Sequence, residues 1–262
     1  MHAFYFGSGR RRLFGIYEPS RLARSRPRAV LLCHPWGSEY LHAHRSMRHL
    51  AGLLADAGID SLRFDYYATG DSAGDGIEGD LAGWRQDILT AAEELTSLAG
   101  VTRLSLVGLR LGATLAAKAS VDLGKAVESL VLWDPITDGR DYVKELYAVC
   151  RAQPIAIKEP VPRPESLGGG FEILGFPLTG RVHAELLDLS LAAIALEVRC
   201  PVHVIVSQSE LAGQRAQKAL DSVSSIAIER IEHLPIWLED WPRSAGIVPV
   251  NVLQKIVQWV AQ

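Results

Sequence analysis

Short apolar runs alternate along the chain with longer segments whose apolar residues recur every three or four positions. The run at 29–33, Ala-Val-Leu-Leu-Cys, is apolar throughout, as expected of a strand in a sheet that helices cover on both faces. Later runs of the same strand character are 60–65, 104–108, 130–134, 202–206 and 226–229. These runs predict the parallel strands of one sheet.

Helical spacing fills most of the gaps between these runs. The predicted helices are 43–57, 80–98, 111–123 and 249–260. Two further strands, 3–6 and 12–17, are joined by the tight turn Gly7–Arg11 and should form an antiparallel edge. Together the pattern predicts an α/β protein with a mostly parallel, eight-stranded sheet and helices on both faces.

One interval breaks the alternation. Residues 136–197, called the insertion below, separate the strand ending at Asp134 from the strand starting near Pro201. A structureless loop of that length is implausible in a compact domain. We therefore expect a core of residues 1–135 and 198–262 and a small helical cap at 136–197, with a flexible stretch near 153–170. The alternative is an ordinary helix followed by a disordered loop.

Composition and charge exclude several classes of protein. The 262 residues carry a net charge of −3, which argues against general nucleic-acid binding. No apolar run reaches the ~20 residues of a membrane span, and no secretory signal is visible. The three cysteines show neither zinc-site nor disulfide spacing. We expect a reduced, cytoplasmic protein with no metal and no cofactor.

Three loops follow predicted strands in positions where a hydrolase would build its active site. His34-Pro35-Trp36-Gly37 follows the strand 29–33, where such a loop supplies one backbone N–H of an oxyanion hole. The segment 64–72, Phe-Asp-Tyr-Tyr-Ala-Thr-Gly-Asp-Ser, follows the next strand. Gly108-Leu109-Arg110-Leu111-Gly112 matches both glycines of a Gly-x-Ser-x-Gly nucleophile turn, with Leu111 in the position of the second oxyanion donor.

The residue at the nucleophile position of this turn is Arg110, whose guanidinium stays protonated and has no usable lone pair. The other triad positions are partly filled: His233 follows the last strand, and Glu210 or Asp134 could be the acid. A displaced nucleophile would have to be found among Ser38, Cys33 and Ser105.

A buried arginine needs an anionic partner. Either Arg110 forms an internal salt bridge to Glu210, Asp134 or Asp65, or it binds the carboxylate or phosphate of a ligand with help from backbone N–H groups. Trp36 and Trp133 either line an apolar channel near this site or belong to the core.

The runs 107–113 (Val-Gly-Leu-Arg-Leu-Gly-Ala), 132–140 (Leu-Trp-Asp-Pro-Ile-Thr-Asp-Gly-Arg) and 234–237 (Leu-Pro-Ile-Trp) resemble the exosortase A system-associated hydrolases of the second type. More broadly, the chain is similar to serine-aminopeptidase-like and thioesterase-like α/β-hydrolases over about 1–140 and 200–262. The resemblance implies the α/β-hydrolase fold and a bacterial role near export or exopolysaccharide production, with a homodimer or a biosynthetic complex as the expected assembly.

Two functions stay open at this point. The first is binding of an acyl or anionic small ligand, or of a partner protein, without serine-hydrolase turnover. The second is esterase or thioesterase activity that uses a non-standard nucleophile or water activated by His34 or His233. A scaffold role with a closed pocket is a further alternative. Fold alone cannot choose among them.

Overall fold

The computed structural model describes residues 1–22, 27–152, 159–207, 210–233, 237 and 248–262. Eight strands form one twisted sheet in the order β1-β2-β4-β3-β5-β6-β10-β11. Their bounds are β1 His2–Ser8, β2 Arg11–Glu18, β3 Ala29–Cys33, β4 Asp60–Phe64, β5 Leu104–Leu109, β6 Val127–Trp133, β10 Val202–Val206 and β11 Ile226–Arg230. Strands β1 and β2 pair antiparallel, as does β2 with β4, and every other pair is parallel.

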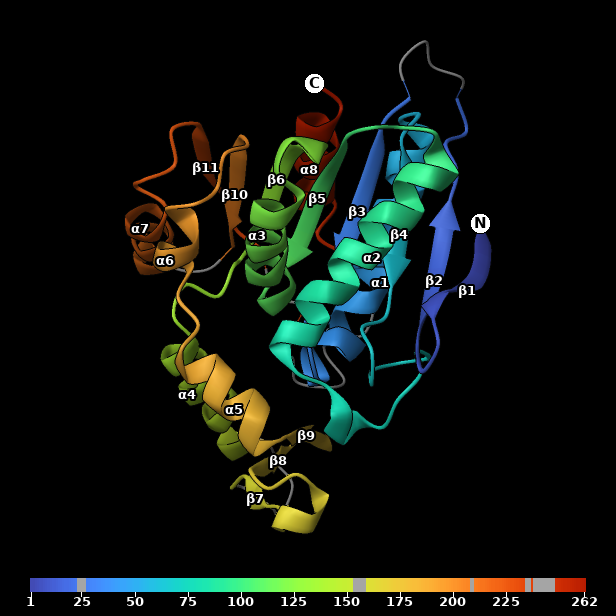
Figure 1. Ribbon diagram of the computed structural model, residues 1–262. Helices are drawn as coiled ribbons and strands as arrows, with labels where there is room; N and C mark the ends of the chain where they lie inside the picture. Colours follow the sequence, from blue (N-terminus) through green and yellow to red (C-terminus); the bar gives the residue numbers. More distant parts are fainter. Residues whose placement is uncertain (23–26, 153–158, 208–209, 234–236, 238–247) are drawn as a thin grey trace.

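Helices cover both faces of this sheet, as the apolar strands require. Helices α2 (Leu81–Ala99) and α3 (Leu111–Leu123) lie in front of it in Figure 1, and α1 (Ser38–Asp56) and α8 (Val250–Val260) lie behind it. Successive residues of β3 alternate between the two cores: Leu31 packs under α2 and α3, and Leu32 packs under α1 and α8. The predicted mostly parallel sheet and its helices are confirmed.

The insertion at 136–197 has more secondary structure than the sequence predicted. It contains α4 (Gly139–Ala152), α5 (Gly180–Leu187) and α6 (Leu191–Ala195). It also contains a small antiparallel sheet of β7 (Val161–Pro162), β8 (Phe171–Ile173) and β9 (Phe176–Leu178). The expected helices are present, and the small sheet between them was not predicted. Residues 153–158 of the expected flexible stretch lie outside the described residues. Its remaining part, 159–170, contains β7 and a short turn of helix. In Figure 1, α4, α5 and the small sheet lie below the main sheet.

A further helix, α7 (Glu210–Ala219), connects β10 to β11, packs against both strands and was not predicted. Its sequence is polar and includes a glycine, Gly213, so its apolar stripe is short. Alanines on its inner side complete the core beside β10. A helix that buries only small residues gives a weak periodic signal, which explains the omission.

The turn from β5 into α3, residues Gly108–Gly112, is called the elbow below. Here α3 approaches β3 so closely that a Cβ on Gly112 would lie 2.2 Å from the carbonyl oxygen of His34 and 2.5 Å from that of Cys33. Both contacts are to backbone atoms, which cannot rotate away. The glycine is therefore required by the close approach of helix and strand.

We predict that Gly112→Ala lowers the free energy of unfolding by about 2 kcal/mol, because the methyl group forces α3 away from β3. Gly52→Ala in α1 is the matched control, since nothing lies within 4 Å of its added Cβ. That change should raise stability by about 0.5–1 kcal/mol through the better helix propensity of alanine. Urea unfolding of both variants measures the difference. Equal effects would show that the close approach is absent.

Candidate functional site

Arg110 occupies the sharpest point of the elbow. Its backbone has φ 54° and ψ −123°, a conformation that side-chain-bearing residues rarely adopt. Its N–H donates to the carbonyl of Trp133 and its carbonyl accepts from Ala113 N, so the turn is held on both sides. The strained strand-to-helix geometry of a nucleophile turn is present with an arginine in it.

The Arg110 side chain is buried, with 5% of the residue exposed, and is held between two glutamates. Its Nε donates to Glu39 Oε1 at 3.0 Å and its Nη2 donates to Glu145 Oε2 at 2.5 Å. Glu39 lies in the first turn of α1, and Glu145 lies in α4. The site therefore joins the elbow, the start of α1 and helix α4 of the insertion.

Aromatic residues complete the enclosure of the guanidinium. Tyr142 donates its hydroxyl to Glu39 Oε2 at 3.0 Å, and its ring centroid lies 5.5 Å from the Arg110 guanidinium carbon. Trp237 lies at 5.4 Å from the same carbon. Both rings offer their electron-rich faces to the cation. The charge is thus compensated by two carboxylates and by two aromatic faces.

Burial and ion pairing act in opposite directions on these groups. Burial lowers the pKa of Arg110, but Glu39 and Glu145 outweigh it and hold the pKa above its ordinary value. Burial raises the pKa of the Glu39 carboxyl against the opposing effects of Arg110 and Tyr142. Arg110 is therefore a permanent cation at the point where a hydrolase would place a nucleophile.

An internal salt bridge of Arg110 was predicted, but its partners among the described residues are Glu39 and Glu145 and not Asp134 or Asp65. Asp65 accepts instead from the Tyr40 hydroxyl at 2.7 Å and from Asp71 N at 2.9 Å. Glu210 begins α7, but its side chain lies outside the described residues. The missed partners had local signals: Glu39 lies two residues after the His34–Gly37 loop, and Tyr142 and Glu145 are three apart on one face of α4.

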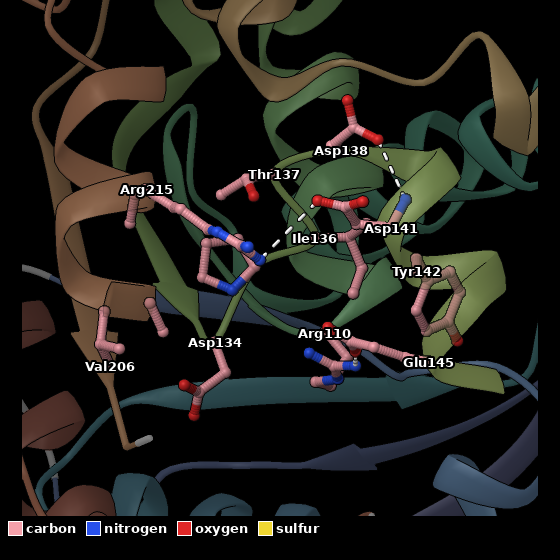
Figure 2. Close-up of a pocket in the computed structure, with 13 residues that line it drawn as sticks. Arg110, Asp134, Ile136, Thr137, Asp138, Asp141, Tyr142, Glu145, Val206 and Arg215 are labelled. Carbon is pink, nitrogen blue, oxygen red and sulfur yellow. Dashed lines mark hydrogen bonds and ion pairs between the residues drawn. The ribbon is translucent and has the colours of Figure 1, made fainter. Parts of the chain in front are cut away.

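Asp134 follows β6 and faces the same space as Arg110 (Figure 2). Its Oδ1 accepts from Ser207 N at 2.9 Å and its Oδ2 from Ser207 Oγ at 2.5 Å. Burial raises the pKa of Asp134 to about 6, despite the opposing effects of Ser207 and Arg110. The charge of Arg110 acts on the Asp134 carboxyl through space, but the hydrogen bonds of that carboxyl are with Ser207 in the loop after β10.

His233 lies near the elbow but is turned toward Trp133. Its Nε2 accepts from the indole N–H of Trp133 at 3.2 Å, and its ring makes an edge contact with Trp237. In a hydrolytic triad, Nε2 is the atom that takes the nucleophile's proton. Here its lone pair points at a tryptophan in the core behind the sheet.

The His34–Gly37 loop is buried, but its side chains do not gather at the elbow. The His34 imidazole makes an edge contact with Tyr40, and Trp36 packs against Trp84 and Phe176. Pro35 is buried too, Gly37 caps α1 with φ 67°, and Leu111 is a core residue at the start of α3. Trp36 and Trp133 are thus core residues, in agreement with the simpler of the two interpretations.

A cavity of about 60 Å³ remains beside Arg110. Figure 2 shows its charged lining, which is Arg110, Asp134, Asp138, Asp141, Glu145 and Arg215. Arg215 of α7 forms an ion pair with Asp141 of α4 at 3.7 Å. The space suits a few water molecules or a small polar group rather than an acyl chain. Among the described residues, no three His, Cys, Asp or Glu side chains converge as a metal site would require.

Comparison with solved structures identifies the architecture. Est1E of Butyrivibrio proteoclasticus, solved with ferulic acid, superposes with a TM-score of 0.67 at 16% identity, over 99% of this chain and 100% of that one. A proline iminopeptidase of Mycobacterium smegmatis gives 0.67 at 15%, over 99% of both chains. The chain has the α/β-hydrolase fold. An esterase of Pyrococcus furiosus gives 0.65 at 14%, over 99% of this chain and 89% of that one.

These identities are too low to carry more than the fold. No protein-family model matches the chain, and no curated protein matches its sequence. Within the described ranges, no helix is both long and apolar enough to cross a membrane. What the α/β-hydrolase fold does here must therefore be argued from the elbow and its surroundings.

We predict that Glu39→Gln lowers the free energy of unfolding by about 3 kcal/mol, because it removes the buried partner of a buried cation. Glu145→Gln should lower it by less than about 1 kcal/mol, since the Glu145 side chain is 46% exposed and water can replace it. Urea unfolding at pH 7 measures both. Equal losses would contradict the unequal roles of the two glutamates.

We predict that Asp134 makes the protein less stable as pH rises from 4 to 7. Its carboxyl keeps a proton up to about pH 6 in the folded state but releases it near 3.8 when unfolded, so ionisation opposes folding by about 3 kcal/mol. In Asp134→Asn, the free energy of unfolding should therefore fall less between pH 4 and pH 7 than it does in the native protein. Asp188→Asn, on the exposed surface, is the control. Urea unfolding at several pH values measures the slopes, and an unchanged slope in Asp134→Asn would contradict the assignment.

Proposed function

We propose that this α/β-hydrolase-fold protein binds a small acyl or anionic ligand, or a partner, without serine-hydrolase turnover. The observation that carries the proposal is the Arg110 side chain at the elbow, held between Glu39 and Glu145. A guanidinium cannot attack a carbonyl carbon, because its lone pairs are delocalised and it stays protonated.

The charges around the elbow also oppose acyl transfer. Hydrolysis of an ester through this fold develops negative charge next to the elbow, and donors must stabilise it. Glu39 places a carboxylate within hydrogen-bond distance of the elbow side chain, and Glu145 places a second one there. A developing oxyanion would meet like charge, so the electrostatics favour binding over turnover.

The alternative esterase or thioesterase needs another nucleophile or an activating histidine. Cys33 points into the core under α2 and α3, and burial raises the pKa of its thiol far above the ordinary value. Ser105 is buried and shares a hydrogen bond with Ser129. The His34 ring lies against Tyr40, and His233 Nε2 accepts from Trp133. These placements favour the binding function.

The ligand would enter by replacing Glu145. The bond of Arg110 to Glu39 is buried, whereas Glu145 lies on α4 with about half of its side chain exposed. A carboxylate or phosphate that took the place of Glu145 would leave Arg110 compensated throughout the exchange. The cavity beside Arg110 is small, so the anionic group would enter first and the rest of the ligand would lie outside it.

We further propose that the chain acts in the cytoplasm of a bacterium beside an export or exopolysaccharide system. The support is the resemblance of the Gly108–Gly112 run to the second type of exosortase-associated hydrolase. In that setting a homodimer or a biosynthetic complex is the expected partner. The division into a core and a cap at 136–197 belongs to the same proposal, with Tyr142 and Glu145 as the residues through which the cap closes the elbow.

We predict that a fluorophosphonate probe does not label the purified protein, because no serine at the elbow can attack it. Arg110→Ser should stay unlabelled as well, since His233 Nε2 is engaged by Trp133 and Glu39 remains beside the new serine. Gel fluorescence and mass spectrometry measure the labelling, with an active serine hydrolase in the same tube as the positive control.

Labelling of the native protein at any serine would refute the binding proposal in favour of the esterase. Ser38→Ala separates the remaining candidate, because Ser38 is only half-buried at the start of α1. Loss of labelling in that variant would assign the nucleophile.

A further inference from the structure

A second cavity, of about 330 Å³, lies beside β4 and shares no lining residue with the cavity at Arg110. Its size falls in the range of small-molecule sites. Its lining comes from β2, the end of β4, the loop after β3 and the start of α1. Figure 1 shows β2 and β4 on the side of the sheet where the N-terminus lies. The residues that matter below are Phe14, Ile16, His34, Tyr40, Arg63 and Asp65. We call it the Arg63 cavity.

Arg63 is buried in β4, with 7% of the residue exposed, and none of the described residues forms a hydrogen bond or ion pair with its side chain. It alternates with Leu62 and Phe64, which pack under α2, so its side chain points to the α1 side of the sheet. Within the described ranges its guanidinium donates no hydrogen bond and has no carboxylate within 4.0 Å, and its Nε is fully buried. Tyr40, Glu18 and Asp65 act on this cation only through space, so an anion bonded directly to the guanidinium would be favoured.

His34 adds a second unpartnered group to the same cavity. Its residue is 3% exposed, and its Nδ1 is buried without a hydrogen-bond partner among the described residues. Burial, with the nearby charges of Arg63 and His44, lowers the pKa of His34 to about 3. The imidazole is therefore neutral at physiological pH and can donate one N–H without adding charge.

The protein's own acids do not satisfy Arg63. Asp65 directly follows β4, two residues from Arg63, and lines the cavity, but its two oxygens accept from Tyr40 and from the backbone of Asp71. Burial lowers the pKa of Arg63, which agrees with the absence of an ion pair. The contrast with Arg110, which has two carboxylates, shows what the Arg63 environment lacks.

We propose that the Arg63 cavity binds a small monocarboxylate whose carboxylate group is held by Arg63 and His34 and whose short apolar body packs on Phe14 and Ile16. An arginine matches a carboxylate through paired N–H bonds. Asp65 and Asp71 also line the cavity, so a dianion such as phosphate meets more repulsion than a monoanion. The apolar side chains on β2 favour a ligand with a hydrocarbon part over a bare ion.

Isothermal titration of the full chain with benzoate tests the proposal. We expect saturable binding of one benzoate per chain, with inorganic phosphate and the neutral benzamide binding at least tenfold more weakly. Arg63→Gln should weaken benzoate binding at least tenfold. Arg85→Gln is the matched control, because Arg85 pairs with Asp122 outside the cavity, and it should bind benzoate within twofold of the native protein.

Thermal unfolding of Arg63→Met provides a second readout. This variant keeps the apolar stem and removes the uncompensated charge, so its Tm without ligand should equal or exceed that of the native protein. Benzoate should raise the Tm of the native protein and leave that of the variant unchanged.

Four results would overturn the proposal. They are no saturable benzoate binding to the native protein, undiminished binding to Arg63→Gln, phosphate binding as tight as benzoate, and a Tm of Arg63→Met well below the native value. The last result would mean that the guanidinium has a structural partner in the folded chain. The outcome is independent of the fluorophosphonate experiment, because no residue of the Arg63 cavity takes part in the elbow network.

Discussion

The ion pair between Arg110 and Glu39 is the constraint on which the rest of the site depends. Both side chains are buried, so replacing either residue by a neutral one leaves the charge of the other buried without its partner. The pair ties the turn after β5 to the start of α1, and through Tyr142 and Glu145 it draws α4 onto the carboxyl end of the sheet. In a serine hydrolase the elbow carries a reactive nucleophile that the substrate can reach. Here it carries a buried arginine that is paired with carboxylates.

The two cavities at this end of the sheet differ in whether their charged and polar groups have partners. At the elbow, every charged group has a partner: Arg110 has two glutamates, Asp134 has Ser207, and Arg215 has Asp141. Beside β4, Arg63 and the imidazole Nδ1 of His34 are buried without partners among the described residues. Where every charged group already has a partner, a ligand forms new bonds only by displacing one of those partners. Where donors lack partners, an added anion forms new hydrogen bonds without displacing anything.

Much of the site was predictable by position but not by orientation. The elbow, the His34–Gly37 loop and the acid at 134 all lie where their places after strands indicated. The imidazoles of His34 and His233 do not point as a triad would need, because Tyr40 and Trp133 engage them from other elements. The partners of Arg110 were missed for the same reason, since α1 and α4 reach the elbow only in the folded chain.

The sequence by itself determined the α/β-hydrolase fold, because strand and helix periodicities depend on local spacing and because Gly108 and Gly112 bracket a recognisable turn. It also determined that the turn carries an arginine instead of a nucleophile. Only the tertiary structure decided which carboxylates neutralise that arginine, and that a second arginine, Arg63, forms no ion pair with any described residue. Charge compensation at a buried site depends on distances between side chains from separate elements, and no spacing along the chain encodes those distances.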